Sequence, residues 1–379
     1  MALARTAGPD RLSSLDVFRG VTIAAMILVN NPGDGATTYA PLLHADWHGC
    51  TPTDLIFPFF LFAVGVALPY AFAGRLARSG GDRGPLHRQI LRRTLILFGL
   101  GLFLNWFPFY SVDWPTARIP GVLQRIAVVY LCAALAWLHL RPRGRAVLAV
   151  VLLAGYWLAM VLVPVPGVGA GDLSPQGNLA GWIDHAVLGA HTWKRAPGPG
   201  DPEGLLSTLP ALASALAGLF AGDWLRSART PLVKIRGLLL AGFATTAAGL
   251  ALSPWFPLNK NLWTSTYVLF TTGLALLLLA AIYLTVDLQP RDGWARPFTL
   301  FGTNAIAAFF GSTLLAKILL RIHCEDAGET VTLQAWLYRH SFGAWLPEYV
   351  GSLAWALAYV ALWLGLMTVL YRRRIFLKV

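Results

Sequence analysis

The stretch HADWHGCTPTDLIFPFFLFAVG, residues 44–65, places two histidines, two aspartates and a cysteine directly before a long apolar run. With its continuation, residues 54–74 reach the roughly 20 residues that a helix needs to cross the hydrocarbon core of a membrane. Because lipid offers no hydrogen-bond partner to the backbone, each crossing must be a helix. Nine further segments have a similar length and apolar character: 17–32, 92–110, 119–140, 145–165, 204–225, 233–252, 262–286, 297–320 and 350–371. We therefore expect an all-α integral membrane protein, a polytopic bundle of about ten transmembrane helices.

The distribution of charge predicts the orientation of this bundle. If the N-terminus is cytoplasmic, the inner segments hold 21 Lys and Arg residues and the outer segments hold 6. Cytoplasmic loops carry such an excess, so we expect both termini inside. The net charge of +12 then reflects topology and not nucleic-acid binding. Twelve of the 18 carboxylates lie in outer segments or at their edges, which suits a cationic ligand, although loop solubility explains the same excess.

The chain is interpreted as one transmembrane domain, residues 1–379, because no repeat of fixed period is visible. The outer loops 31–53, 166–203 and 322–349 are expected to cover the site. We expect a short helix at GWIDHAVLGA in the second loop, and the weakly amphipathic VTLQAWLYRHSFGAWL in the third could lie on the membrane surface. Cys50 and Cys324 both fall on the outer side, where a disulfide bridge can form.

Titratable side chains concentrate in the loop before the second span. Residues 20–74 contain no Lys or Arg, so no cation competes with His44 for a proton. A near-neutral imidazole at a membrane mouth can act as general base or as nucleophile. Asp54 or Asp46 could orient it. The alternative interpretation is a threonine N-cap, with Asp54 only complementing the helix dipole.

Ionisable and polar residues inside spans are functional candidates because they are costly in lipid. Arg125 lies about one and a half turns into the fourth span beside Gln124, and Arg118 stands at the outer mouth of that span. Asn304 lies within the ninth span, where its amide must find a partner. Walker A, zinc-ligand and Rossmann motifs are missing from the sequence, so we expect no metal and no ATP-driven transport.

Further polar residues mark the outer entries of two spans. Asp201 and Glu203 precede the sixth span, where they could also be helix-dipole complements. The eighth begins with a polar cluster that also fits an interfacial belt: Asn259, Lys260, Asn261 and Trp263.

These residues belong to a series of motifs that occur in a fixed order: RLSSLDVFRG, the VN ending in Asn30, HADWHGCTPTDLIFPFFLFAVG, RIPGVLQRIA, DPEGLLSTLPA, NKNLWTSTYVL and GTNAI. The series resembles that of heparan-α-glucosaminide N-acetyltransferase and its bacterial relatives. The resemblance implies a transmembrane acyltransferase that takes acetyl from cytosolic acetyl-CoA. The acceptor would be the amine of a terminal glucosamine on the far side of the membrane.

The resemblance also implies roles for particular residues. The histidine of the family's HAxW motif maps onto His44 and the upstream asparagine onto Asn30, which could stabilise an oxyanion. The other candidates follow from the charge distribution and the polar positions described above. The expected sugar-binding residues are Asp46, Trp47, Asn259, Lys260, Asn261, Trp263, Asp201 and Glu203. The expected acetyl-CoA-binding residues are Arg88, Arg92, Arg93, Arg118, Gln124, Arg125 and Asn304.

Two other functions stay open at this point. One is a secondary transporter of amino sugars, although no span appears broken in matching positions of two halves. The other is acyl transfer to a different cell-envelope glycan. Only about 16 residues precede the first span, without the long luminal domain of the animal enzyme, which favours a smaller amino sugar or an envelope saccharide. We expect a bacterial inner-membrane protein whose partners are acetyl-CoA, an amino sugar and the lipid bilayer, and a homodimer is left open.

Overall fold

The computed structural model describes residues 12–289 and 293–377. Tertiary contacts divide the chain into two compact units, which are described separately. The first unit comprises Met1–Leu15, Asp46–Cys50 and Phe57–Pro290. The second comprises Asp16–Ala45, Thr51–Ile56 and Arg291–Val379. The loop that holds the two histidines is therefore divided between the units.

The long helices confirm an all-α integral membrane architecture. Within the described residues, 8 helices are long and apolar enough to cross a membrane, or 9 if a bent pair counts as one span. They match the predicted segments except 92–110, which corresponds to α3 (Gly84–Trp106). This helix has 23 residues but carries three arginines in its first half, which lower its apolar character. The count of ten crossings therefore stays a prediction.

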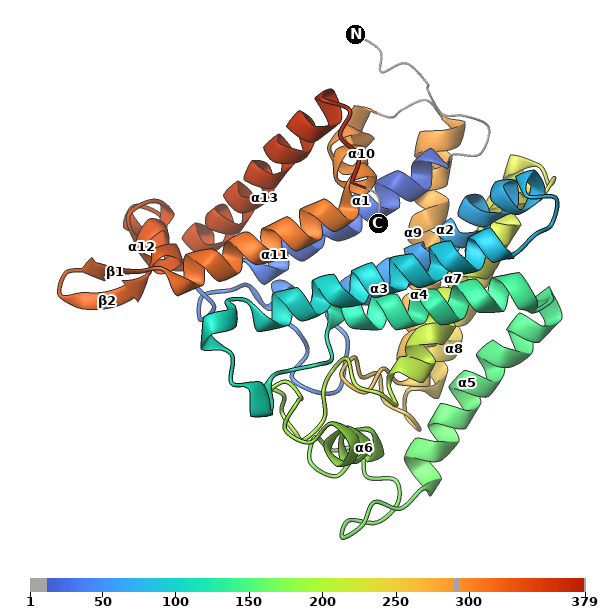
Figure 1. Ribbon diagram of the computed structural model, residues 1–379, viewed down its shortest axis with the longest axis horizontal. Helices are drawn as coiled ribbons and strands as arrows, with labels where there is room; N and C mark the ends of the chain where they lie inside the picture. Colours follow the sequence, from blue (N-terminus) through green and yellow to red (C-terminus); the bar gives the residue numbers. More distant parts are fainter. Residues whose placement is uncertain (1–11, 290–292, 378–379) are drawn as a thin grey trace. The chain divides into compact units, whose positions relative to one another are not determined.

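The first unit is a bundle of helices (Figure 1). Its members are α2 (Ile56–Arg78), α3, α4 (Val122–His139), α5 (Pro142–Leu162), α7 (Thr208–Arg226), α8 (Pro231–Leu252) and α9 (Ser265–Ile282), which continues as a π-helix (Tyr283–Leu288). Small residues let these helices approach closely. A Cβ on Gly65 of α2 would lie 1.9 Å from the Ala215 carbonyl oxygen of α7, and one on Gly218 would lie 2.0 Å from that of Phe62.

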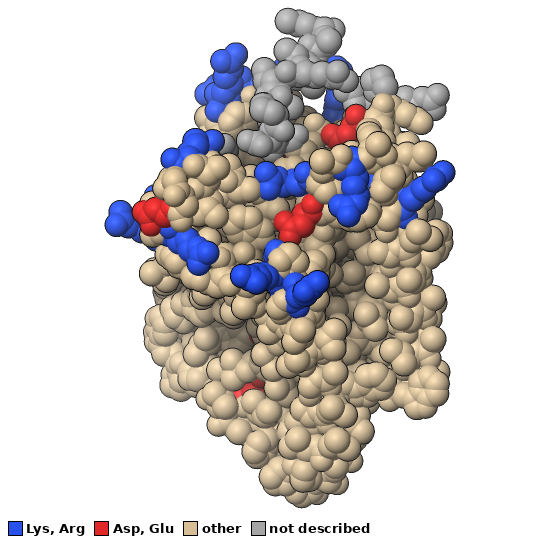
Figure 2. Space-filling model, turned by 90° about the vertical axis from the view of Figure 1, so that its right-hand side faces the viewer, with Lys and Arg blue, Asp and Glu red and all other residues tan. Residues whose placement is uncertain are grey.

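Basic side chains gather at one end of this bundle. His87 at the start of α3 contacts His139 at the end of α4, with 2.9 Å between their Nε2 atoms. Arg226 at the end of α7 lies over the ring of Tyr70 in α2. On the face drawn in Figure 2, Lys and Arg side chains collect in the upper half, and the lower half is nearly uncharged. Four of the 21 residues predicted to be on the inner side, Arg5, Arg11, Arg291 and Lys378, lie outside the described residues.

The opposite end of the bundle carries the loops of the first unit. The connection between α3 and α4 contains two 3₁₀ turns, Phe109–Ser111 and Trp114–Thr116. The predicted short helix in 166–203 is confirmed as α6 (Leu179–Leu188). Its N-cap is Asn178, whose Oδ1 accepts a hydrogen bond of 2.7 Å from the Gly181 N–H, as a capping asparagine should.

The second unit contains α1 (Ser13–Asn30, from Asp16 onward), α10 (Arg296–Thr303), α11 (Ala305–Arg321) and α13 (Glu348–Arg372), with a 3₁₀ turn (Gly293–Ala295) before α10. The predicted continuous span 297–320 is wrong, because α10 and α11 meet at an angle of 74° (Figure 1). The break falls at Asn304, whose φ and ψ of −126° and 39° are not helical. Among the described helices this is the one bent pair, so no matching break in a second half accompanies it.

The third outer loop contains more regular structure than expected. A hairpin of β1 (His323–Asp326) and β2 (Glu329–Thr332) precedes α12 (Leu333–Arg339) and a 3₁₀ turn (Phe342–Ala344). Ala327 and Gly328 both have positive φ, which a two-residue hairpin turn requires. Cys324 is a free thiol in this hairpin.

Candidate active site

Asp54 holds His44 through a direct side-chain contact. Asp54 lies in the 3₁₀ turn Pro52–Leu55 that leads into α2, and Thr51 precedes this turn as its N-cap. The Nδ1 atom of His44 lies 2.7 Å from Oδ1 of Asp54. Of the two candidate orienting carboxylates, Asp54 therefore makes the contact. Its N-cap role is also present, because Oδ2 accepts a hydrogen bond of 3.0 Å from the Thr51 N–H.

Two backbone N–H groups bind the other oxygen of Asp54. The Asp54 side chain is 1% exposed, and Oδ2 also accepts the Ala45 N–H at 3.1 Å. When Asp54 is ionised it can only accept at Oδ1, and Nδ1 of His44 then carries the hydrogen. The basic lone pair of the imidazole then lies on Nε2. Because the His44 side chain is 52% exposed, a substrate can approach this ring.

Asn30 ends α1 in the same unit as His44. Its side chain is exposed, whereas that of Asn31 is buried and donates to the Ile27 carbonyl at 2.7 Å. The two neighbouring asparagines therefore have different environments. Asn31 closes the helix end, and Asn30 presents an amide at the surface.

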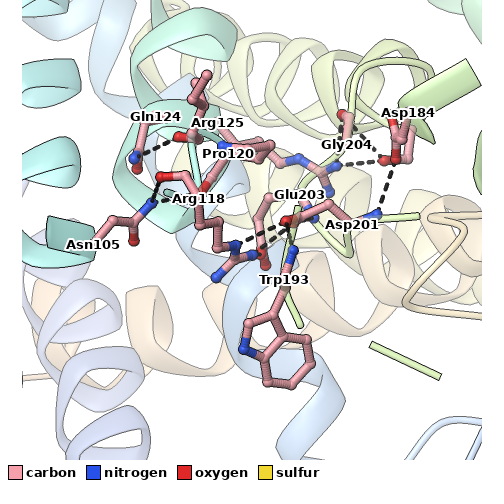
Figure 3. Close-up of polar contacts among 12 residues, drawn as sticks. Asn105, Arg118, Pro120, Gln124, Arg125, Asp184, Trp193, Asp201, Glu203 and Gly204 are labelled. Carbon is pink, nitrogen blue, oxygen red and sulfur yellow. Dashed lines mark hydrogen bonds and ion pairs between the residues drawn. The ribbon is translucent and has the colours of Figure 1, made fainter. Parts of the chain in front are cut away.

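A second polar centre lies in the first unit, where Arg118 faces Asp201 and Glu203 (Figure 3). Its Nε and Nη2 atoms donate to the two oxygens of Asp201 at 2.8 and 2.6 Å, and Nη2 also donates to Glu203 at 2.5 Å. Burial alone would lower the pKa of the Arg118 guanidinium, but the hydrogen bonds to Asp201 and the charge of Glu203 outweigh it and raise that pKa. Arg118 is predicted to bind acetyl-CoA, and Asp201 and Glu203 are predicted to bind the sugar. In the structure, Arg118 forms ion pairs with both carboxylates.

The DPEG segment, residues 201–204, joins this centre to the interior of the bundle. Its Gly204 carbonyl accepts a hydrogen bond of 3.1 Å from Arg125, whose guanidinium also contacts Ser207. Arg125 is only 2% exposed and lies over the ring of Trp263, 5.2 Å from its centre. Since α4 begins at Val122, after Pro120 and Gly121, Arg125 stands in the first helical turn and not one and a half turns into the span.

Asp184 is a central residue that sequence reasoning missed. Its two carboxylate oxygens accept the backbone N–H groups of Asp201 and Leu205 at 3.0 and 2.8 Å. Burial raises its pKa, although these two hydrogen bonds oppose the shift. Gly204 packs against the carboxylate so closely that a Cβ there would lie 1.9 Å from Oδ2. An aspartate inside the motif-free GWIDHAVLGA carried no signal for this role.

The arginines expected at acetyl-CoA lie in two groups, one near each end of α4. Arg88 and Arg92 are exposed at the start of α3, and Arg93 lies over the ring of Tyr130 at 4.6 Å. Arg118, Gln124 and Arg125 lie at or before the start of α4, whose opposite end meets the start of α3. An 18-residue helix is about 27 Å long at 1.5 Å per residue, so one phosphate group cannot contact both sets.

Two of the amides in this group have backbone partners. The side chain of Gln124 donates to the Ile119 carbonyl at 2.9 Å. Asn304, in the second unit, donates to the Ile375 carbonyl at 3.1 Å and accepts the Leu377 N–H at 2.9 Å. The buried amide predicted to need a partner therefore binds the segment after α13, and both amides form hydrogen bonds with the backbone.

Three of the residues expected at the sugar line one shallow pocket of the first unit. Trp47, Asp201 and Asn261 border this pocket together with Asp184 and other residues of the 166–203 loop. Trp47 is held by a hydrogen bond of 2.8 Å from its indole N–H to the Leu173 carbonyl. Three of the predicted residues therefore lie together, whereas their role in binding a sugar stays a prediction.

The other expected sugar-binding residues do not line this pocket. Asn259 and Trp263 are almost fully buried. Asn259 accepts the Leu262 N–H at 2.8 Å, and its Nδ2 lies 3.3 Å from Nδ1 of His48. Lys260 is half-buried and Asp46 is exposed. Asn259 and Trp263 therefore build the start of α9 and do not present polar atoms to solvent.

Comparisons with known proteins agree with this arrangement of motifs. Residues 11–242 match the family model described as heparan-alpha-glucosaminide N-acetyltransferase, catalytic. That range includes His44, Asp54, Arg118 and the DPEG segment. The chain belongs to this family.

Two relatives carry the name heparan-alpha-glucosaminide N-acetyltransferase. The human protein is 29% identical over 427 residues, an alignment that covers 98% of this chain and 60% of the human protein. The mouse protein is 28% identical over 367 residues, which cover 82% of this chain and 54% of the mouse protein. The chain thus spans little more than half the length of these relatives.

Proposed function

We propose that the protein transfers acetyl from cytosolic acetyl-CoA to the amine of a glucosamine-type sugar on the outer side of the membrane. The single observation that carries this proposal is the His44–Asp54 pair, which lies within the residues that match the family model. The basic end of the first unit would face the cytoplasm, with both chain termini inside. A bacterial inner membrane is the proposed location.

His44 would act through Nε2, the ring nitrogen that does not face Asp54. In direct transfer, Nε2 takes a proton from the sugar ammonium, and the free amine attacks the thioester carbonyl. The carbon–sulfur bond then breaks, the attacking nitrogen loses its second proton to water, and the imidazolium returns its proton to the departing thiolate. In a two-step route the same nitrogen would first carry the acetyl group. Acetyl label that stays on the protein without acceptor, and is released by glucosamine, would identify the two-step route.

Charge stabilisation at the acetyl group would come from Asn30. An amide N–H that faces the developing oxyanion lowers the barrier because it is already oriented before reaction. The exposed side chain of Asn30 is suited to this role. We expect Asn30→Ala to lower kcat by about 100-fold with little change in glucosamine KM. Unchanged turnover would exclude the oxyanion role.

The basic end of the first unit supports binding of acetyl-CoA. Arg88 and Arg92 are exposed and four residues apart on α3, so their side chains lie on one helix face. Two guanidinium groups at this spacing suit the phosphates of CoA. We expect Arg88→Gln combined with Arg92→Gln to raise the acetyl-CoA KM and to leave the glucosamine KM unchanged. The same double change in the exposed Arg141 and Arg143 is the matched control.

The direct test measures transfer of labelled acetyl from acetyl-CoA to glucosamine by purified protein in lipid vesicles. We expect label on the sugar with the wild-type protein and none above background with His44→Ala. The control is His323→Ala, since His323 is another exposed histidine of the second unit. Equal transfer by His44→Ala would contradict the proposal. Uptake of glucosamine by vesicles without acetyl-CoA would support a transporter instead.

Labelling of Cys324 tests the proposed orientation of the protein in the membrane. This thiol is free and lies in the third outer loop. In a Cys50→Ser background, we expect a thiol reagent that cannot cross membranes to label Cys324 in intact spheroplasts, and the further change Cys324→Ser to remove that label. Labelling of Cys324 only after the membrane is opened would reverse the orientation.

A further inference from the structure

A buried asparagine of the first unit fixes the ring of His48. Asn259 lies in the loop before α9 and is fully buried. Its Oδ1 accepts a hydrogen bond of 2.8 Å from the Leu262 N–H. A backbone N–H can only donate, so this atom is the amide oxygen and the NH₂ group points the other way. That NH₂ group lies 3.3 Å from Nδ1 of His48.

This contact defines where His48 carries its hydrogen. An NH₂ group can only donate, so Nδ1 accepts, and the hydrogen of the neutral imidazole lies on Nε2. The imidazolium form would place a second hydrogen on Nδ1, facing the hydrogens of the Asn259 amide. Burial also lowers the pKa of His48. The ring is therefore uncharged at neutral pH and has a hydrogen-bond donor at Nε2.

The segment around His48 is held on both sides, but the His48 side chain itself is exposed. The Gly49 N–H donates to the Leu258 carbonyl at 2.7 Å. On the other side, the ring of Trp47 lies edge-on to that of His48, with 6.2 Å between their centres. Because Nδ1 faces a buried amide, the exposure belongs to the rest of the ring, which carries Nε2. A ligand can therefore reach this donor.

A neutral donor at this place suits a ligand that is cationic and carries hydroxyl groups. An imidazolium or a guanidinium would donate equally well but would repel an ammonium group. Residues 20–74 contain no Lys or Arg, so the segment of His48 adds no other cation. His48 also follows His44 by only four residues. The proposed acceptor fits this environment, because glucosamine carries an ammonium group and several hydroxyl groups on one ring.

We propose that His48 binds the acceptor sugar through its Nε2–H, which donates a hydrogen bond to one hydroxyl oxygen of the sugar. The inference rests on the proposed acetyl transfer and adds a residue that selects the acceptor. On a terminal glucosamine the hydroxyl groups at carbons 3, 4 and 6 are free, and His48 donates to one of these. Asn259 is then a positioning residue, because it acts through His48.

The test removes the donor and the sugar hydroxyl separately and together. The acceptors are methyl glucosaminide and its 3-, 4- and 6-deoxy derivatives, and His48→Phe keeps a planar ring without an N–H. With the wild type, we expect one deoxy acceptor to have a KM about tenfold above that of methyl glucosaminide, with kcat nearly constant. With His48→Phe, the KM for methyl glucosaminide should rise by a similar factor, and loss of that hydroxyl should have no further effect.

Two further variants separate binding from folding. His48→Gln keeps an oxygen for the Asn259 amide and an NH₂ group for the sugar, so it should restore most of the affinity and the dependence on the same hydroxyl. His185→Phe, at another exposed histidine of the first unit, should behave like the wild type. Nitrogen NMR of histidine-labelled wild-type protein adds a reading without sugar. The signal that is missing in His48→Gln should show a hydrogen on Nε2 and none on Nδ1.

The outcomes separate this inference from the proposed reaction. If the wild type acetylates neither glucosamine nor methyl glucosaminide, the proposed reaction is wrong, and this inference with it. If both are acetylated and all three deoxy acceptors have the KM of methyl glucosaminide, the reaction stands and the role of His48 is wrong. An equal dependence on the hydroxyl in wild type and folded His48→Phe would also overturn the inference, as would a hydrogen on Nδ1 of His48.

Discussion

Replacing Asp54 by asparagine should invert the hydrogen-bond pattern at His44 with almost no change in shape. Oδ2 of Asp54 accepts hydrogen bonds from two backbone N–H groups, whereas Oδ1 faces His44. A hydrogen bond contributes about 1 kcal/mol, so the amide oxygen of the introduced asparagine should keep these two donors. Its NH₂ group would then face Nδ1 of His44.

This inversion removes the reactive lone pair. When Nδ1 accepts a hydrogen bond from the amide, the hydrogen of the neutral imidazole moves to Nε2. The attraction between carboxylate and imidazolium is also lost. At about 4 Å and an effective dielectric of 20 it would be about 4 kcal/mol, and we halve it because the imidazole is 52% exposed. About 2 kcal/mol corresponds to roughly 30-fold in rate, and the wrong tautomer adds to it, so kcat should fall by at least about 100-fold.

The assay is acetyl transfer to glucosamine at saturating acetyl-CoA, with the Tm of each variant measured in the same vesicles. Asp54→Asn should keep a Tm near that of the wild type. Asp54→Ala should lower it, because the Ala45 and Thr51 N–H groups lose their acceptor. Asp46→Asn is the matched control, since it removes an exposed carboxylate two residues from His44. A folded Asp54→Asn protein with kcat within tenfold of the wild type would refute the reasoning, as would a larger loss in Asp46→Asn.

Three further predictions concern stability. Arg118→Met should lower the free energy of unfolding by about 3–5 kcal/mol, because Asp201 and Glu203 lose their cation. Arg195→Met, at an exposed site in the neighbouring loop, is the control and should change this free energy little. Equal Tm values for the two variants would show that the ion pairs contribute nothing to stability. Gly204→Ala should prevent correct folding, since its Cβ would lie 1.9 Å from the Asp184 carboxylate. The control Gly155→Ala meets no atom within 4 Å and should stabilise α5 by up to about 1 kcal/mol. A normal yield of folded Gly204→Ala protein would contradict the predicted clash. Burial lowers the pKa of His48 from 6.5, so the unfolded state binds more protons just below that pH. Stability should therefore be lost as the pH falls from 6.5 to the lowered pKa of the folded protein. Tm measured against pH should show this slope in the wild type, and an equal slope in His48→Gln would assign it to another group.

Sequence patterns determined the helices of this protein because each depends on local physics. A membrane-length apolar segment must be helical, whatever lies beside it, and this holds for segments such as 54–74 and 233–252, which correspond to α2 and α8. The short helix α6 was likewise predictable from local signals. The broken span at Asn304 was not, because its apolar pattern runs through the break, and the cause is a contact with backbone 71 and 73 positions away.

The motifs identified which residues to examine, but only the tertiary structure decided what each one contacts. His44 and Asp54 are ten residues apart and meet within one loop, so sequence could propose the pair and could not choose between Asp54 and Asp46. Arg118 and Asp201 are 83 residues apart, and their opposite charges suggested two ligands where there is one ion pair. Asp184 carried no pattern at all, since its role depends on two backbone N–H groups of another segment. Local hydrophobicity determines helices, whereas a pairing between distant side chains exists only after the bundle has formed.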